Sequence, residues 1–315
     1  MIRKEEFTFD SRDGQTKLHA VRWVPEGKVR CVLQIVHGMA EYVERYEEFA
    51  QYMAERGILV TGEDHLGHGK SVPEGGTYGY FCKQDAATVV VRDIHRLKKM
   101  TQEEYPGVPH VIFGHSMGSF MLRNYMYRYG TGIQGAILGG TGYTPFWAAT
   151  CAGAAAKVLG ILTGEKSVSH LLNKVAFGSY NKRVKQPKTA YDWLAADEAV
   201  VEKYLQDPYC GFIFTVNGFR TLFELLKRAH TPENMQKIPK ELPVFLVAGE
   251  EDPVGDYGEG VKRIYRDYTD SLGMKNATLK LYAGDRHEIL NEKDRQQVYE
   301  ELYPWIMERV KEYQL

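Results

Sequence analysis

The chain has 315 residues, of which 43% are hydrophobic and 26% are charged, and its formal net charge at pH 7 is −1. This length allows one large domain with an insertion or two ordinary domains, and the composition is typical of a soluble globular protein. Because the net charge is close to zero, electrostatics gives no reason to expect binding to nucleic acid or to an anionic membrane.

The N-terminus and the cysteines bear on the cellular compartment. The first ten residues, MIRKEEFTFD, lack the apolar core of a signal peptide, and no run approaches the roughly eighteen apolar residues of a membrane span. The cysteines are far apart and form no C-x-x-C pair, which predicts reduced, mostly buried thiols rather than a zinc site or disulfides: Cys31, Cys82, Cys151 and Cys210. We therefore expect a cytoplasmic protein.

In chain order, apolar segments typical of strands alternate with segments of helical periodicity. Strands are predicted at 17–24, 31–38, 58–64, 110–116 and 132–140, and helices at 44–56, 85–104 and 117–130. Continuous apolar strands separated by helices indicate a sheet that is buried on both faces. The pattern therefore predicts an α/β fold with a mostly parallel central sheet flanked by helices.

This alternation stops at residue 143 and resumes at 240. In between there is no convincing strand, but helical patterns occur at 147–164, 169–178 and 214–230. Further strands are predicted at 242–253 and 277–285, and further helices at 258–272 and 292–313. We predict a core of residues 1–142 and 240–315, with residues 143–239 inserted as a helical cap, or lid. An independent helical domain is the alternative, although the continuous pattern on both sides favours an insertion.

Ser116 lies in the stretch VIFGHSMGSF, between Gly114 and Gly118. A Gly-x-Ser-x-Gly match is weak by itself, because chance gives one in roughly one protein in ten. Here a predicted strand precedes the serine and a helical pattern follows it. A tight strand-to-helix turn needs glycine on both sides of the serine for steric reasons, so this context predicts a nucleophile.

Two residues beyond late strands could activate this serine. A serine hydroxyl needs a neutral imidazole to accept its proton, and the imidazole needs an acceptor that fixes its tautomer. His287 and Asp252 supply these groups. The order Ser116, Asp252, His287 is that of nucleophile, acid and histidine in the α/β-hydrolase fold.

Five segments carry a specific resemblance to a known family. They are HGMAEYVERY (37–46), DHLGHGKS (64–71), GHSMG (114–118), GEEDPVG (249–255) and GDRHEILNE (284–292). Over nearly its whole length the chain resembles α/β-hydrolases of the monoacylglycerol lipase and lysophospholipase family, which are serine hydrolases. The resemblance implies an α/β-hydrolase fold with an inserted helical lid. It also implies hydrolysis of a monoacylglycerol, a lysophospholipid or a similar carboxylic ester through an acyl-enzyme, without a cofactor or metal.

The resemblance assigns the acid of the triad. Glu250, Glu251 and Asp256 share a loop with Asp252, but the family places the acid directly before Pro253. It therefore favours Asp252.

The resemblance also implies an oxyanion hole. Two main-chain N–H groups aimed at the developing oxyanion are worth roughly 3 kcal/mol each. The residue after the nucleophile, Met117, supplies one N–H, and the residue after the HG pair, Met39, supplies the second. For Met39, a simple packing role is the alternative.

Glu41 and Arg45 are the substrate-binding candidates. Relatives that cleave glycerol esters use the Glu and Arg of HG-x-x-E-x-x-x-RY near the leaving alcohol. Ala40 and Tyr42 depart from the family, where glycine and histidine are common at these positions. The alternative is that Glu41 and Arg45 pair with each other and never contact the substrate.

Two other features bear on function. Asp64, His65 and His68 could in principle hold a metal, but no distant ligand cluster supports this, and we predict no metal site. The apolar segment 148–162 could line an acyl tunnel, touch a membrane or form the core of the lid. Its lysine, Lys157, and its glycines argue against a membrane span.

The expected partner is a small acyl ester or lipid, with no nucleic acid and at most peripheral membrane contact through the lid. One alternative is an aminopeptidase or amidase with the same triad, because fold does not fix substrate. A catalytically silent ligand-binding protein is the other, and the intact triad counts against it. The acyl chain length, the head group and the oligomeric state cannot be predicted from this sequence.

Overall fold

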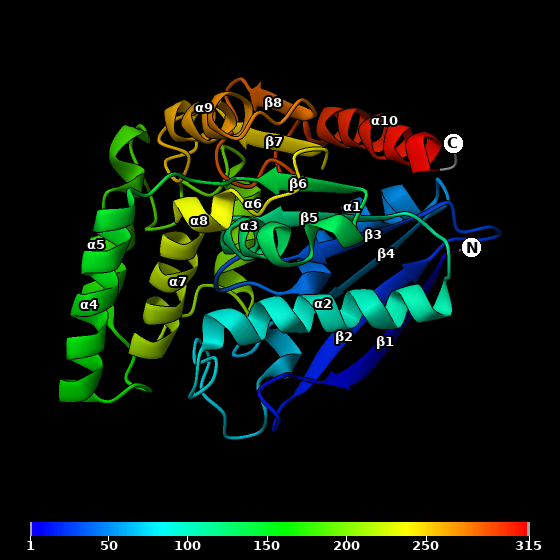
Figure 1. Ribbon diagram of the computed structural model, residues 1–315. Helices are drawn as coiled ribbons and strands as arrows, with labels where there is room; N and C mark the ends of the chain where they lie inside the picture. Colours follow the sequence, from blue (N-terminus) through cyan, green and yellow to red (C-terminus); the bar gives the residue numbers. More distant parts are fainter. Residues whose placement is uncertain (1, 314–315) are drawn as a thin grey trace.

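A computed structural model describes residues 2–313, in which eight strands form one sheet between layers of helices (Figure 1). In chain order the strands are β1 Arg3–Asp10, β2 Lys17–Val24, β3 Cys31–Val36, β4 Ile58–Glu63, β5 His110–His115, β6 Gly135–Gly139, β7 Val244–Gly249 and β8 Ala277–Tyr282. The order across the sheet is β1-β2-β4-β3-β5-β6-β7-β8. β1 and β2 pair antiparallel, β2 pairs antiparallel with β4, and the other neighbouring strands pair parallel. The predicted mostly parallel sheet is therefore confirmed.

Helices cover both faces of the sheet. The core helices are α1 Glu47–Ala54, α2 Ala86–Glu104, α3 Met117–Tyr129, α9 Glu259–Arg266 and α10 Arg295–Tyr313. Short helical segments are the 3₁₀ helices η1 Val43–Tyr46, η2 Gly69–Ser71 and η3 Gly130–Gly132 and the π-helix η5 Asp267–Ser271. Ile112 of β5 packs in the core cluster that contains α2 and α3, whereas Phe113 packs in the cluster of α1 and α10. Successive residues of a strand point to opposite faces, so every residue of β5 is buried, and each large apolar side chain contributes about 1.5–3 kcal/mol.

The segment between β6 and β7, the cap segment, is largely helical. It contains α4 Phe146–Thr163, α5 His170–Phe177, η4 Tyr180–Arg183, α6 Glu198–Gln206, α7 Val216–Ala229 and α8 Pro232–Met235, with one isolated bridge between Val168 and Thr215. In Figure 1, α4 and α7 lie beyond the arrowheads of β5 and β6, which mark the carboxyl ends of these strands. In parallel sheets this edge carries the ligand site, so the segment stands where a cap would lie.

Helix α4 is the apolar segment of the sequence, and most of it is exposed. Its buried residues are Ala149, Ala156 and Gly160, and Lys157 is its charged residue. By length and composition alone, α4 could cross a membrane. The expectation that no segment reaches this length was therefore wrong, because the alanine-rich residues 146–156 before Lys157 and the apolar residues 158–162 after it belong to one helix.

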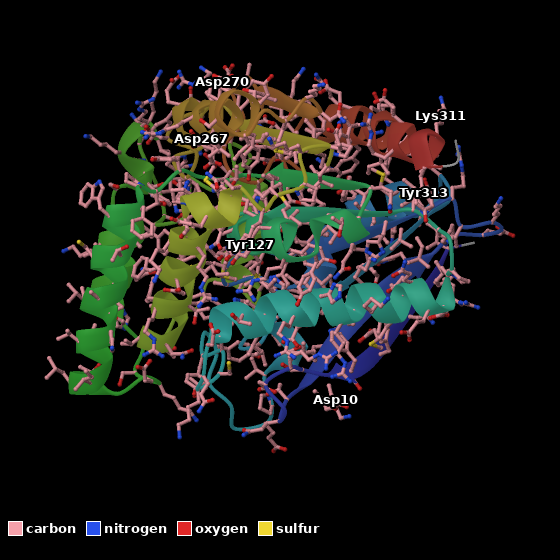
Figure 2. All side chains as sticks on the ribbon, viewed as in Figure 1. Asp10, Tyr127, Asp267, Asp270, Lys311 and Tyr313 are labelled. Atoms are coloured by element: carbon pink, nitrogen blue, oxygen red, sulfur yellow. The ribbon has the colours of Figure 1, made fainter. Side chains whose placement is uncertain are left out.

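Charged side chains gather on the outside of the molecule. Figure 2 shows Asp10, Asp270 and Lys311 at its periphery, and all three are exposed. Of the four thiols, Cys31 and Cys82 are buried; Cys210 is half-buried and Cys151 exposed, and all four are free. The prediction that most of the thiols are buried is wrong, because only Cys31 and Cys82 are.

Candidate active site

Ser116 occupies the junction between β5 and α3. Its backbone has φ 52° and ψ −120°, a conformation in which a non-glycine residue is strained. A Cβ atom at Gly114 would overlap the main chain of Gly118, and one at Gly118 would overlap the carbonyl oxygen of Val36. The two glycines therefore permit the sharp turn, and strain of this kind is typical of an exposed nucleophile.

His287 and Asp252 form a buried pair in the loops that follow β8 and β7. Nδ1 of His287 lies 2.9 Å from Oδ2 of Asp252, and their exposed fractions are 2% and 0%. The other carboxylate oxygen of Asp252 accepts a hydrogen bond of 2.8 Å from the N–H of Val254. Asp252 can therefore hold the imidazole in the tautomer that leaves Nε2 able to accept a proton.

The rival carboxylates of this loop lie elsewhere. Glu250, Glu251 and Asp256 are exposed. Asp252 is buried and bonds His287, so the geometry favours Asp252 over these three carboxylates as the triad acid.

A cavity of about 580 Å³ opens onto Ser116 and His287. Its walls are mainly apolar, and α3, α4 and α7 contribute Met117, Phe120, Ala148, Ala149, Ala152, Leu222, Phe223 and Leu226 to them. A volume of this size is typical of small-molecule sites, and the apolar wall suits an acyl chain.

Met39 and Met117 also line this cavity. Met117 is the first residue of α3, where a main-chain N–H has no acceptor within the helix. The loop that carries Met39 runs close to the nucleophile, since a Cβ atom at Gly38 would lie 3.2 Å from Cβ of Ser116. The segment that carries Met39 therefore lies beside Ser116, and the role of the two N–H groups as oxyanion donors stays a prediction.

The structure brings Glu41 and Arg45 together. Nη1 of Arg45 donates to Oε2 of Glu41 at 2.7 Å, and both Nη atoms of Arg45 donate to the carboxylate of Glu288 at 2.8 Å. Burial by itself raises the pKa of Glu41, but the hydrogen bond from His115 and the charge of Arg45 hold that pKa below its ordinary value. Burial lowers the pKa of Arg45, while the charges of Glu288 and Glu41 hold it well above the ordinary value.

Of this pair, only Glu41 lines the cavity. Glu41 and Glu288 line it, whereas Arg45 is not among the lining residues and lies with its guanidinium 4.9 Å from the ring of Tyr204. Glu41 and Arg45 pair with each other, as the alternative to substrate binding predicts. Contact of either residue with a leaving alcohol stays a prediction.

Sequence reasoning missed the residues that tie the histidine loop to the cap segment. The N–H of Glu288 donates to the carbonyl of Leu194 at 2.7 Å. Nη1 of Arg286 donates to the carbonyls of Asp192 and Ala195 at 2.6 and 2.9 Å. The segment around residue 194 is thus fastened to the loop that carries His287.

Further contacts join the same two segments. The carboxylate of Glu292 accepts the N–H groups of Ala196 and Asp197 at 2.7 and 3.3 Å, and the ring of Trp193 lies 5.1 Å from that of His287. GDRHEILNE predicted the histidine of the triad, but nothing in its pattern indicated that Glu288 and Glu292 are buried and Arg286 half-buried.

The histidines of the DHLGHG loop make hydrogen bonds that involve the main chain. The N–H of His65 donates to Nε2 of His37 at 3.0 Å, and Nε2 of His65 lies 3.2 Å from the carbonyl of His37. Nδ1 of His68 bonds the carbonyl of Leu66 at 2.9 Å, and burial lowers the pKa of His68 to about 3. Asp64 accepts main-chain hydrogen bonds from Val43 and Lys70. These side chains brace the loop beside Met39 rather than converge on a common point.

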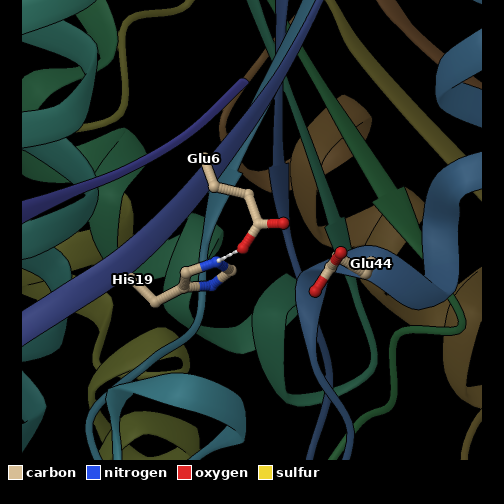
Figure 3. Close-up of side chains that lie close together, drawn as sticks. All are labelled: Glu6, His19 and Glu44. Carbon is tan, nitrogen blue, oxygen red and sulfur yellow. Dashed lines mark hydrogen bonds and ion pairs between the residues drawn. The ribbon is translucent and has the colours of Figure 1, made fainter. Parts of the chain in front are cut away.

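A different group has the spacing of metal ligands. Glu6, His19 and Glu44 offer atoms that all lie within 4.8 Å of one another (Figure 3). However, Nζ of Lys70 lies 2.8 Å from Glu6 and 3.0 Å from Glu44, and Lys4 lies 2.9 Å from Glu44. The ammonium groups already balance these carboxylates, so the geometry gives no reason to place a metal ion here.

Comparison with known proteins agrees with this architecture. Residues 27–294 match the model of the family described as serine aminopeptidase, S33. The chain is 27% identical over 292 residues to a monoacylglycerol lipase of Mycolicibacterium smegmatis, with 90% of this chain and 91% of that protein covered. It is 27% identical over 303 residues to a monoglyceride lipase of Rattus norvegicus, with 95% and 89% covered.

Solved structures give the same result. A highly thermostable carboxyl esterase from Bacillus coagulans, solved in complex with glycerol, is 31% identical and superposes with a TM-score of 0.91. The alignment covers 98% of this chain and 100% of the esterase.

Proposed function

The chain belongs to the serine aminopeptidase S33 family of α/β-hydrolases, and we propose that it is a serine hydrolase that cleaves carboxylic esters through an acyl-enzyme. The observation that carries the proposal is the placement of Ser116. It sits in a strained turn on the same cavity as His287, which in turn bonds the buried Asp252.

Each residue has a defined part in the proposed reaction. Nε2 of His287 accepts the proton of Ser116 while Oγ attacks the ester carbonyl, and Asp252 stabilises the imidazolium that forms. The N–H groups of Met39 and Met117 bind the oxyanion. His287 then gives its proton to the leaving alcohol, and a water molecule, activated by the same imidazole, hydrolyses the acyl-enzyme.

The proposed substrates are monoacylglycerols, lysophospholipids or similar esters of a single acyl chain. The apolar cavity wall fits an acyl chain. Two similar proteins are named monoacylglycerol and monoglyceride lipases, and the similar esterase was solved with glycerol. Because the family is described as serine aminopeptidase, aminopeptidase activity is the alternative. That activity needs a carboxylate for the substrate ammonium, and both cavity carboxylates, Glu41 and Glu288, already bond Arg45.

A substrate panel tests this proposal. We expect turnover of p-nitrophenyl esters of graded length and of monoacylglycerol or lysophosphatidylcholine, with aminoacyl amides cleaved far more slowly. Ser116→Ala is the control for each substrate. Faster turnover of the amides than of every ester would replace the proposal by the aminopeptidase alternative.

Peripheral membrane contact through the cap is part of the same proposal. Large apolar side chains of α4 and α5 are exposed to solvent, by 62–76%: Trp147, Ile161, Leu162, Leu171 and Val175. Exposed apolar patches of this kind mark interaction surfaces, and a lipid surface would supply the substrate. We expect the double variant Ile161→Glu, Leu162→Glu to float less with phosphatidylcholine vesicles while hydrolysing soluble p-nitrophenyl butyrate at the wild-type rate. Equal flotation of variant and wild type would contradict this contact.

A further inference from the structure

His115, the last residue of β5, lies between the loop of Glu41 and the loop of His287. It is 5% exposed. Its Nδ1 lies 3.4 Å from Oε1 of Glu41, and its Nε2 lies 3.2 Å from the carbonyl oxygen of His287. The imidazole therefore bridges the segment next to Met39 and the main chain of the candidate general base.

Both atoms that face the ring nitrogens of His115 are acceptors. A carbonyl oxygen can only accept a hydrogen bond. The carboxylate of Glu41 already accepts from Arg45, from the N–H of Gly38 and from the hydroxyl of Tyr46, which fits an ionised group. A neutral imidazole has one N–H, whereas an imidazolium has two. Only the protonated ring can donate to both oxygens.

The balance of buried charge points the same way. Glu41 and Glu288 carry two negative charges and Arg45 carries one positive charge, so these three groups leave a net charge of −1. An uncompensated buried charge is strongly unfavourable. A proton on His115 brings the cluster to neutrality, so His287, whose ring lies 4.7 Å away, would face no net charge from it.

The titratable and charged groups around His115 come from two elements. Glu41, Arg45 and Tyr46 come from the loop and turn after β3, and His287 and Glu288 come from the loop after β8. Burial lowers the pKa of His115, but the hydrogen bond and charge of Glu41 and the charge of Glu288 leave that pKa above its ordinary value.

We propose that His115 works as an imidazolium that positions His287, by joining its carbonyl to the carboxylate of Glu41. This role rests on the proposed ester hydrolysis, because it acts through the general base of that reaction. Loss of the proton removes one of the two hydrogen bonds that the ring of His115 donates, so the ring no longer joins the two loops and the His287 loop loosens. Activity should therefore fall on the alkaline side of the pH profile when His115 deprotonates.

The kinetic test compares kcat against pH for wild type, His115→Asn and the control His110→Asn. His110 lies at the other end of the same strand and bonds Gln34, and burial lowers its pKa to about 3, so it stays neutral. For His115→Asn we expect kcat at pH 7 to fall at least ~10-fold with KM within ~3-fold, and the alkaline limb to disappear. The control should keep the alkaline limb.

The outcomes separate the two proposals. If the wild type hydrolyses no ester at any pH, the proposed function fails. If it hydrolyses esters but His115→Asn keeps the wild-type alkaline limb, the positioning role of His115 fails.

A second measurement does not depend on how well the variant folds. Nitrogen-15 NMR of histidine-labelled wild-type protein at pH 7 reports the protonation of each ring nitrogen. We expect the His115 ring to carry protons on both Nδ1 and Nε2. A neutral tautomer at this position would overturn the inference.

Discussion

Arg45 holds Glu288 through two hydrogen bonds of 2.8 Å each, and Glu288 directly follows the candidate general base in the chain. A bidentate pair of this kind fixes the position of the carboxylate as well as balancing its charge. The peptide of His287 is therefore held by a side chain from the opposite end of the sequence.

Removal of Arg45 should destabilise the fold. Arg45→Met leaves the carboxylates of Glu41 and Glu288 buried without their cation, which typically costs about 3–5 kcal/mol. Arg45→Lys should cost less, since the charge remains but the paired donors are lost. The free energy of unfolding from guanidinium titrations at pH 7 measures both. As a control, Arg56→Met removes a partly exposed guanidinium that stacks on Tyr52. If Arg45→Met lowered the free energy of unfolding no more than this control, the network of Arg45, Glu41 and Glu288 would be unimportant for stability.

The acid of the triad can be tested by two matched substitutions in one loop. Asp252→Asn should keep the fold but lower kcat by roughly 10⁴-fold, because an amide favours the wrong tautomer of His287. Asp256→Asn should leave kcat nearly unchanged, because Asp256 is exposed. Steady-state kinetics on p-nitrophenyl butyrate decide between them, and the reverse result would move the acid to Asp256.

The cavity wall on α4 should control the acyl chain length. Ala152 lines the cavity, so Ala152→Trp should fill part of it and reduce turnover of long-chain esters. Turnover of the butyrate ester should stay within about tenfold of wild type, which is about 1.4 kcal/mol of activation free energy. Ile161, on the same helix, is 76% exposed, and Ile161→Trp should change neither. The ratio of kcat/KM for laurate and butyrate esters is the measurement. Equal loss on both esters in Ala152→Trp would mean that this part of α4 is structural only.

Stability should depend on pH through Asp93. Burial raises the pKa of this carboxyl to about 7, although Ser11 donates to it at 2.7 Å. Because the folded-state pKa exceeds the unfolded value of about 4, the protonated group stabilises the fold at low pH, and this stabilisation is lost as pH rises from about 4 to about 7. Asp93→Asn cannot titrate. Its free energy of unfolding relative to wild type should therefore increase over this range, whereas a difference that stays constant would contradict the burial argument.

Local pattern was sufficient for most of the sheet. Strand β2 has the predicted bounds 17–24 because apolar residues recur along its whole length. Strand β1 was missed because RKEEFTFD is rich in charge and only its Phe9 is buried, as expected for an exposed edge strand. Helices α6 and α8 were missed because they are short and few of their residues face the core.

The candidate site divides in the same way. Ser116, Asp252 and His287 could be proposed because each follows a predicted strand and lies in a recognisable motif. Arg286 and Glu288 could not, since a charged residue in a loop usually predicts exposure. The cap segment around Leu194, about 90 residues earlier in the chain, buries Glu288 and partly covers Arg286, and only tertiary structure brings the two segments together.

Mass spectrometry of the protein after treatment with a fluorophosphonate tests the central claim most directly. Wild type should carry one adduct, on the peptide that contains Ser116, because the reagent reacts with an activated serine. Ser116→Ala, with an unchanged circular dichroism spectrum, should carry none. An unlabelled wild type, or an adduct that persists on another serine of Ser116→Ala, would contradict the assignment of Ser116 as the nucleophile.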